Sequence, residues 1–183
     1  MSIRPAMLAF VCALVAAPAL VSGQTKPNFS GTWSRVDTDP ERASVATTGD
    51  QTFRIGSPGS GWGSPLIVRH DTKALVVEYA QFSAYDLQPP IRLSFAMDGS
   101  DSRNDLMIGH TQSTQHSRLA WRDDKLLITT VIDVPELRGT PRVEVRQVLA
   151  LESADTLAIE TTRTGPAGTT PSVARTLYRR TGA

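Results

Sequence analysis

The chain has 183 residues, with 19 Lys and Arg side chains against 18 Asp and Glu side chains and a formal net charge of +1. Hydrophobic residues make up 40% of it, which is enough for one buried core in a single domain. The near balance of charge gives no electrostatic reason to expect nucleic acid or an anionic membrane surface as a partner.

The first 23 residues have the pattern of a secretory signal peptide. Arg4 precedes an apolar run over residues 7–21, which is followed by Ser-Gly. The run is too short for a membrane span, and its basic start and small-residue end are typical of a segment that is removed after export. We expect cleavage after Gly23, which leaves residues 24–183 as one domain in the periplasm or outside the cell.

Cysteine usage follows from this expectation. The single cysteine, Cys12, lies inside the apolar run. The mature chain would therefore have no disulfide bond and no thiolate metal ligand, although an exported protein could form disulfides. Since Arg4 is the only charged residue before residue 24, the mature chain would carry 18 basic and 18 acidic side chains.

The first segment with strand character is residues 28–33, Asn-Phe-Ser-Gly-Thr-Trp. Thr32 and the aromatic residues favour an extended backbone. Gly31 leaves out a side chain at a point where another backbone or a ring must come close. We expect Trp33 to plug one end of a barrel.

A long polar stretch rich in Gly and Pro follows over residues 36–64. It favours neither helix nor central strand, because Gly adds backbone entropy and Pro removes a hydrogen-bond donor. We expect a long loop that lies over the open end of the barrel or stays on the surface. Trp62 is its most informative residue: the indole either packs at the barrel mouth, as part of a lid, or is offered to a protein partner.

Apolar and polar residues then alternate with period two, broken by turn residues. The pattern predicts strands at residues 66–70, 74–79, 91–97, 115–122, 126–132, 142–151, 157–162 and 173–180, with residues 106–108 as a short or edge strand. Together with the opening segment this gives about nine or ten strands. Asp98-Gly99 is the strongest short signal for a hairpin turn.

The short connections decide the fold class. Consecutive hairpins favour a meander, and a meander that curls on itself pairs its first strand with its last and leaves no open edge. We predict an all-β fold, an antiparallel up-and-down barrel of about 8 to 10 strands, with residues 173–180 beside residues 31–36. A β-sandwich with Greek-key crossovers is the alternative that the same spacing allows.

The opening hexapeptide resembles the first-strand signature of the calycins, the superfamily of lipocalins and fatty-acid-binding proteins, and is also similar to the start of many small exported bacterial proteins. The resemblance implies a lipocalin-like barrel, and a basic residue of the last strand, Arg175 or Arg179, over the ring of Trp33 at the barrel base. The Arg-x-Tyr pair of fatty-acid-binding proteins has no counterpart, because Arg175 and Tyr178 are three residues apart.

The positions expected to face inward are mostly aliphatic, which suits either a dry cavity or a filled core. On the last strand the alternation places Leu177 inside. The residues that we expect to line a ligand site are Leu93, Phe95, Met97, Trp121, Ile128 and Leu149. They point to a small hydrophobic molecule as the ligand.

Signals for catalysis and for metal binding are weak. The chain has no nucleophile elbow, phosphate-binding glycine loop or His-Glu-x-x-His motif. The three histidines, His70, His110 and His116, have no acidic residue at a recognised metal-ligand spacing, and the Asp pairs fall at turns, where Asp caps its own backbone. We therefore expect no catalytic residue, no metal and no cofactor.

Two functions from different classes follow. The first is an exported, noncatalytic barrel that binds a small hydrophobic ligand. The second is a structural or protein-interaction module with a filled barrel, whose partner meets the loop around Trp62. An enzyme of unknown type is the third alternative.

Overall fold

The computed structural model describes residues 26–36, 62–80, 90–108, 111–133, 142–165 and 170–182. The predicted signal peptide and most of the loop over residues 36–64 lie outside these ranges. Within them the chain forms ten strands and no helix. No helix of the length and apolarity needed to cross a membrane is therefore found in the described part of the chain.

The strands follow one another along the chain. They are β1 (Gly31–Arg35), β2 (Leu66–His70), β3 (Ala74–Tyr79), β4 (Ile91–Ala96), β5 (Ser102–Ile108), β6 (Thr111–Arg122), β7 (Lys125–Asp133), β8 (Arg142–Ser153), β9 (Thr156–Thr164) and β10 (Ser172–Gly182). Their order in the sheet is β4-β3-β2-β1-β10-β9-β8-β7-β6-β5, and every pair that shares a ladder is antiparallel.

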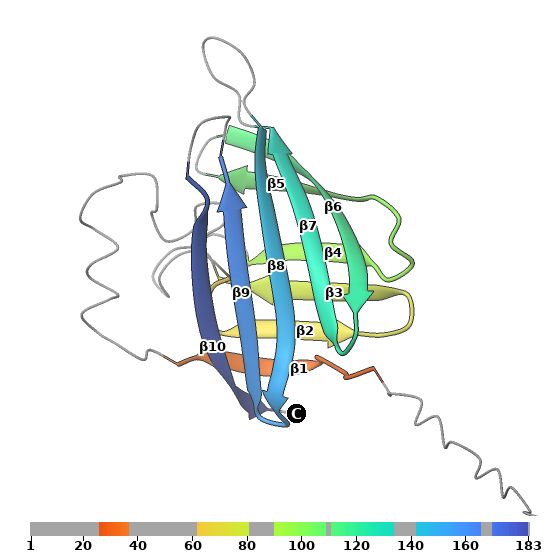
Figure 1. Cartoon of the computed structure of the whole chain (residues 1–183), viewed down its shortest axis with the longest axis vertical. Helices are drawn as coiled ribbons and strands as arrows, with labels where there is room; N and C mark the ends of the chain where they lie inside the picture. Colours follow the sequence, from red (N-terminus) through yellow and green to blue (C-terminus); the bar gives the residue numbers. More distant parts are fainter. Residues whose placement is uncertain are drawn as a thin grey trace, which may run out of the picture.

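A single sheet therefore curls into a nearly closed barrel, with β1–β4 running across β6–β10 (Figure 1). The first and last strands pair as predicted, with Trp33 opposite Arg180 and Arg35 opposite Tyr178. The all-β meander barrel is confirmed. The sandwich alternative is wrong, because neighbouring strands in the sheet are neighbours in sequence apart from the β1–β10 pair.

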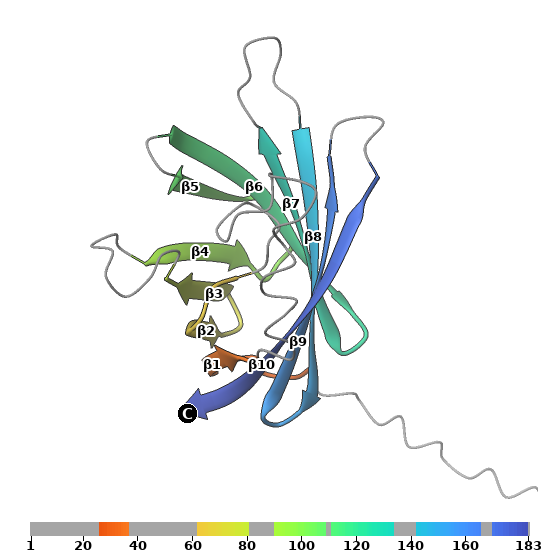
Figure 2. The ribbon, with the colours of Figure 1, turned by 90° about the vertical axis from the view of Figure 1, so that its left-hand side faces the viewer.

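The two ends of the sheet, β4 and β5, lie near each other but share no backbone ladder (Figure 2). Side chains of β5 bridge them. Asn104 Oδ1 accepts from the Ser94 N–H at 2.8 Å, and Asn104 Nδ2 donates to the Ser94 carbonyl at 3.1 Å. Ser102 Oγ accepts from the Ala96 N–H at 2.8 Å. These side chains stand in for the neighbouring backbone at the seam between β4 and β5.

The predicted turn at Asp98-Gly99 is present, but the hairpin is not. Gly99 has a φ of +79°, which favours glycine, and Asp98 Oδ1 accepts from the Ser100 N–H at 2.9 Å. After the turn, β5 forms its ladder with β6. The turn signal fixed the local bend, whereas the choice of partner for β5 depends on the long ladder with β6.

The main core lies inside the barrel and takes side chains from all ten strands. Its fully buried members include Phe29, Trp33, Leu66, Leu75, Phe95, Leu119, Leu126, Ile128, Leu149, Leu157, Ile159 and Tyr178. Burial alternates along the strands, most regularly along β7, which is the period that the sequence predicts. On β10 the predicted face is wrong: Tyr178 is buried, while Leu177 is only half-buried.

Candidate functional site

The base of the barrel is closed by Trp33 and Arg180. The Trp33 side chain is completely buried, and the Arg180 guanidinium carbon lies 4.2 Å from the centre of its ring. Arg180 also donates to the Ser30 carbonyl at 2.6 Å and to the Ala154 carbonyl at 3.0 Å. Gly31 permits this arrangement, because a Cβ there would come within 2.4 Å of Arg180 Nη1.

The expected arginines of the last strand are not the ones that cover Trp33. Arg179 pairs with Ser34 in the ladder and is exposed, and Arg175 is exposed and forms an ion pair with Glu152. Trp33 faces Arg180 because the β1–β10 register shifts between Thr32 and Trp33. The closing contact is therefore made one residue further along than Arg179.

An aromatic cluster lies beside this contact at the same end of the barrel. The rings of Phe29, His70 and Trp121 lie 5.8 to 6.2 Å apart, and Lys26 Nζ lies 5.0 Å from the Trp121 ring. His70 Nδ1 accepts from the Phe29 N–H at 3.3 Å. Burial lowers the pKa of His70, since desolvation disfavours the charged imidazolium, and the nearby Asp71 opposes this shift only in part.

Trp62 packs inside the barrel. Its side chain is 4% exposed and its ring lies 6.4 Å from that of Phe95. The Trp62 carbonyl accepts a 2.5 Å hydrogen bond from the Tyr178 hydroxyl. The indole therefore lies in the core at the position expected of a residue packed into the barrel, and the loop residues before it lie outside the described residues.

Two tyrosines in this region are strongly desolvated. Burial raises the pKa of Tyr79 to about 12. The pKa of Tyr178 is raised as well, first by burial and further by Tyr79, while Arg35 opposes the shift. Both phenols therefore stay neutral at physiological pH.

The six residues expected to line a ligand site belong to the main core or pack against it. Leu93, Phe95, Ile128 and Leu149 are at most 4% exposed, and Met97 and Trp121 are partly buried. Trp121 belongs to the aromatic cluster at the base. These side chains belong to one packed cluster, so they would bound an interior site on the side of the main core.

A group of buried polar residues faces the inside of the barrel, and the sequence pattern does not predict it as a group. Ser117 on β6 lies opposite Thr130 on β7, and Gln147 on β8 lies opposite Thr161 on β9. We call Gln115, Ser117, Thr130, Gln147 and Thr161 the interior polar band. Each is at most 8% exposed. The sequence sign of this group is a polar residue at an inward position whose neighbours on the same face are apolar, such as Gln147 between Val145 and Leu149.

Beyond the band lies a second, smaller apolar group. Ile132, Val143 and Val145 form a cluster that is separate from the main core, with exposures of 3 to 4%. We call these three residues the loop-side cluster, because they lie towards the ends of β7 and β8 that residues 134–141 connect. The polar band thus separates two apolar regions inside the barrel.

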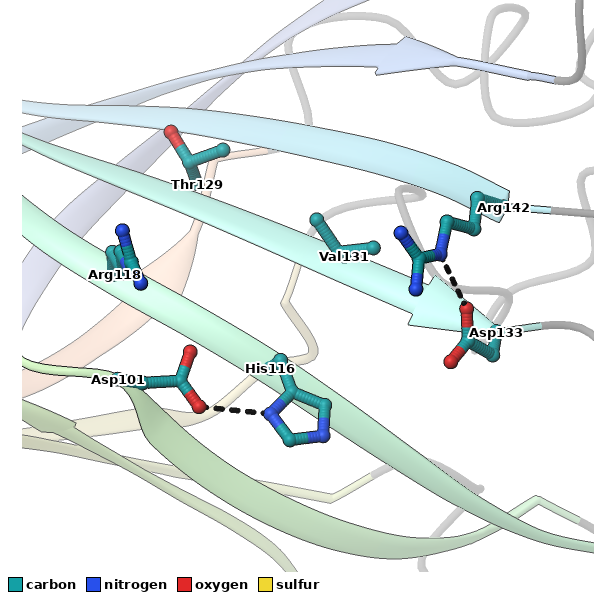
Figure 3. A pocket seen from close by; sticks show the side chains of 7 residues that line it. All are labelled: Asp101, His116, Arg118, Thr129, Val131, Asp133 and Arg142. Atoms are coloured by element: carbon teal, nitrogen blue, oxygen red, sulfur yellow. Dashed lines mark hydrogen bonds and ion pairs between the residues drawn. The ribbon is translucent and has the colours of Figure 1, made fainter.

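A hollow of about 630 Å³ lies on the outside of the barrel (Figure 3). It is lined by Asp101, His116, Arg118, Thr129, Val131, Asp133 and Arg142. His116 Nδ1 lies 2.8 Å from Asp101 Oδ2, and Arg142 Nε lies 3.0 Å from Asp133 Oδ1. All four side chains are about half exposed or more, so these surface pairs are well solvated.

The residues that line the outer hollow do not form a metal-ligand group. Its lining includes one histidine and two carboxylates, but no three potential metal ligands come together anywhere in the described residues. His70 is at the base and His116 on the outer face, while His110 lies outside the described residues. The barrel interior is the stronger candidate.

Comparisons with protein-family models, with curated proteins and with solved structures give no match for this chain. The function therefore has to be argued from the residues themselves.

Proposed function

We propose that the protein is an exported, noncatalytic binding protein that holds a small hydrophobic molecule inside its barrel. The proposed site lies inside the barrel between β6, β7, β8 and β9, on the side of the main core that is away from Trp33 and the base. As an exported protein it would act in the periplasm or outside the cell. The calycin-like opening motif agrees with this function, since such barrels serve as containers for apolar molecules.

The observation that carries the proposal is the unequal distribution of large side chains inside the barrel. Trp33, Phe29 and Trp121 gather at the base, and Trp62 and Phe95 pack above them in the core. In contrast, the buried inward positions of β6–β9 that lie further from the base than Leu119 and Leu149 carry no aromatic ring. Medium-sized side chains leave more room than rings for a ligand.

The buried Trp62 argues against the partner-binding alternative. An interaction module that used this residue would expose its indole, as binding surfaces usually do with their aromatic anchors. Here the Trp62 ring lies in the core and its carbonyl is bonded to Tyr178. The remaining alternative is a filled barrel without a ligand. It would be indicated if the experiment described next detects no binding.

The experiment is a fluorescence titration with N-phenyl-1-naphthylamine, a neutral apolar dye, together with native mass spectrometry of the purified protein. We expect saturable, blue-shifted emission with about one dye per chain. Val145→Phe should weaken dye binding at least roughly tenfold, because it adds a ring to a 4% exposed inward position.

The matched control is Val148→Phe on the same strand, at a half-buried position on the opposite face of β8. It adds the same ring to the outer side and should leave the dye affinity unchanged. Absence of dye binding and of any co-purified small molecule in the wild-type protein would refute the proposed function.

A further inference from the structure

We infer that the ligand is amphipathic and uncharged: it carries a neutral hydrogen-bonding group that binds the side-chain amide of Gln147 or of Gln115, and an apolar part that packs against the loop-side cluster between them. This inference rests on the proposed function and specifies the chemical class of its ligand.

The first argument is that the two amides lack protein partners. Ser117 Oγ and Thr130 Oγ1 satisfy each other at 2.9 Å. Gln115 and Gln147, which are 8% and 6% exposed, make no side-chain hydrogen bond with any part of the described chain. Any hydrogen bond of these two amides is therefore made with a group from outside the described chain, either water or a ligand.

The second argument concerns the space next to the amides. In the described part of the chain, every polar side-chain atom that is completely sealed from solvent has a hydrogen-bond partner. Since the amides of Gln115 and Gln147 have none, their polar atoms are not completely sealed and are reached by water. Two glutamines on β6 and β8 thus present donors and acceptors to the inside of the barrel.

The third argument is the absence of a charge partner in the band. Its five members are amides and hydroxyls, which bind neutral groups without neutralising a charge. An ion placed there would lose its hydration without gaining a counter-ion, which is strongly unfavourable. Arg163 lies two residues beyond Thr161 on the same strand face, but it is half-buried and already takes part in an interaction of its own.

The fourth argument is the position of the loop-side cluster. Ile132 lies opposite Val143, and Val145 lies opposite Thr130 of the band. These three side chains are buried but separate from the main core. A ligand whose polar group reaches Gln147 would have apolar surface two residues away on the same face of β8, at Val145. An amide beside a small aliphatic patch suits a molecule with one polar end.

Three probes of the same ring system test this inference: naphthalene, 2-naphthol and 2-naphthoate. At pH 7 the first is apolar, the second has a neutral hydroxyl and the third is charged. Their affinities are measured by displacement of N-phenyl-1-naphthylamine and by calorimetry. We expect 2-naphthol to bind about tenfold more tightly than naphthalene, and 2-naphthoate to bind most weakly.

Two independent variants, Gln115→Leu and Gln147→Leu, replace the amides by apolar groups of similar size. The variant at the glutamine that binds the hydroxyl should reduce the preference for 2-naphthol over naphthalene, and both variants should leave the affinity for naphthalene unchanged. A full preference in both variants would overturn the inference. The matched control is Gln112→Leu, an exposed position on the outer face of β6, which should keep the full preference. A purely structural role would shift the affinities of all three probes together.

The outcomes separate the two proposals. If the dye and naphthalene bind but 2-naphthol binds no more tightly, the inferred ligand class is wrong and the proposed function stands. If 2-naphthoate binds most tightly, the ligand is an anion and the inference is overturned. If no probe binds, the inference and the proposed function both fail.

Discussion

Asn104 pairs with both backbone groups of Ser94, through one bond of 2.8 Å to the N–H and one of 3.1 Å from the side-chain amide to the carbonyl. A carboxamide has the same donor and acceptor as a peptide group, so it continues the hydrogen bonding of β4 where no strand lies alongside. With Ser102 it closes the seam between the two ends of the sheet.

Asn104→Leu should lower the free energy of unfolding by about 2 kcal/mol, since it leaves two backbone groups of β4 without their partner. Ser102→Ala, which removes one bond to Ala96, should have about half this effect. Urea unfolding followed by tryptophan fluorescence measures both. Asn28→Leu serves as the control, because Asn28 is exposed and makes only a local bond to Ser30. Equal stability of the Asn104 and Asn28 variants would contradict the role of the seam.

Arg180→Met should lower the free energy of unfolding by about 2–3 kcal/mol. The variant loses the contact with the Trp33 ring and two hydrogen bonds to backbone carbonyls. Arg179→Met is the matched control, because Arg179 is exposed on the outer face of the same strand, and it should change stability by less than about 0.5 kcal/mol. A larger loss for Arg179→Met than for Arg180→Met would show that the assignment is wrong.

Gly31→Ala should destabilise the protein by about 2 kcal/mol for two separate reasons. The φ of +148° disfavours a side chain, and the new Cβ would collide with the Arg180 guanidinium. In an Arg180→Met background the collision is relieved, so the same substitution should be less harmful. Thermal unfolding of the four proteins in this cycle gives the coupling. Strict additivity would rule out the contact.

Stability should fall as the pH is lowered below the unfolded pKa of His70. Burial keeps the folded pKa of His70 below its usual 6.5, so the unfolded chain binds a proton more readily and gains relative to the folded state. The contribution is fully present above pH 6.5 and is lost as the pH falls through the folded pKa. Protonation also removes the acceptor for the Phe29 N–H.

Urea midpoints measured between pH 7.5 and pH 5 check this expectation. The wild-type midpoint should decrease, and His70→Gln should show a weaker dependence on pH. His116→Gln, at an exposed histidine on the outer face, is the control for substitution of a histidine as such. An unchanged pH dependence in His70→Gln would assign the effect to other groups.

The strands and their inward faces could be predicted because burial on one side imposes period two. Leu126, Ile128, Thr130 and Ile132 alternate along β7 in sequence and in structure. The pairing of β1 with β10 followed from the meander. The sequence predicts this strand only from residue 115, whereas β6 begins at Thr111. The earlier residues are polar because Gln112 and Thr114 lie on the outer side of β6.

Register and seam chemistry could not be predicted. A shift of one residue exchanges the two faces of a strand, and the irregularity after Thr32 decides that Trp33 meets Arg180. The role of Asn104 depends on the distance between strands that are not paired. The polar band was visible as glutamines in apolar sets, but the sequence does not show whether an amide has a partner.

The contact between Ser30 and Arg180 joins groups 150 positions apart. Since β4 and β5 share no ladder, the β1–β10 pair is the backbone connection that joins β1–β4 to β5–β10 in one sheet. In synthesis from the N-terminus, the last strand to emerge is therefore the one that links the two halves of the sheet.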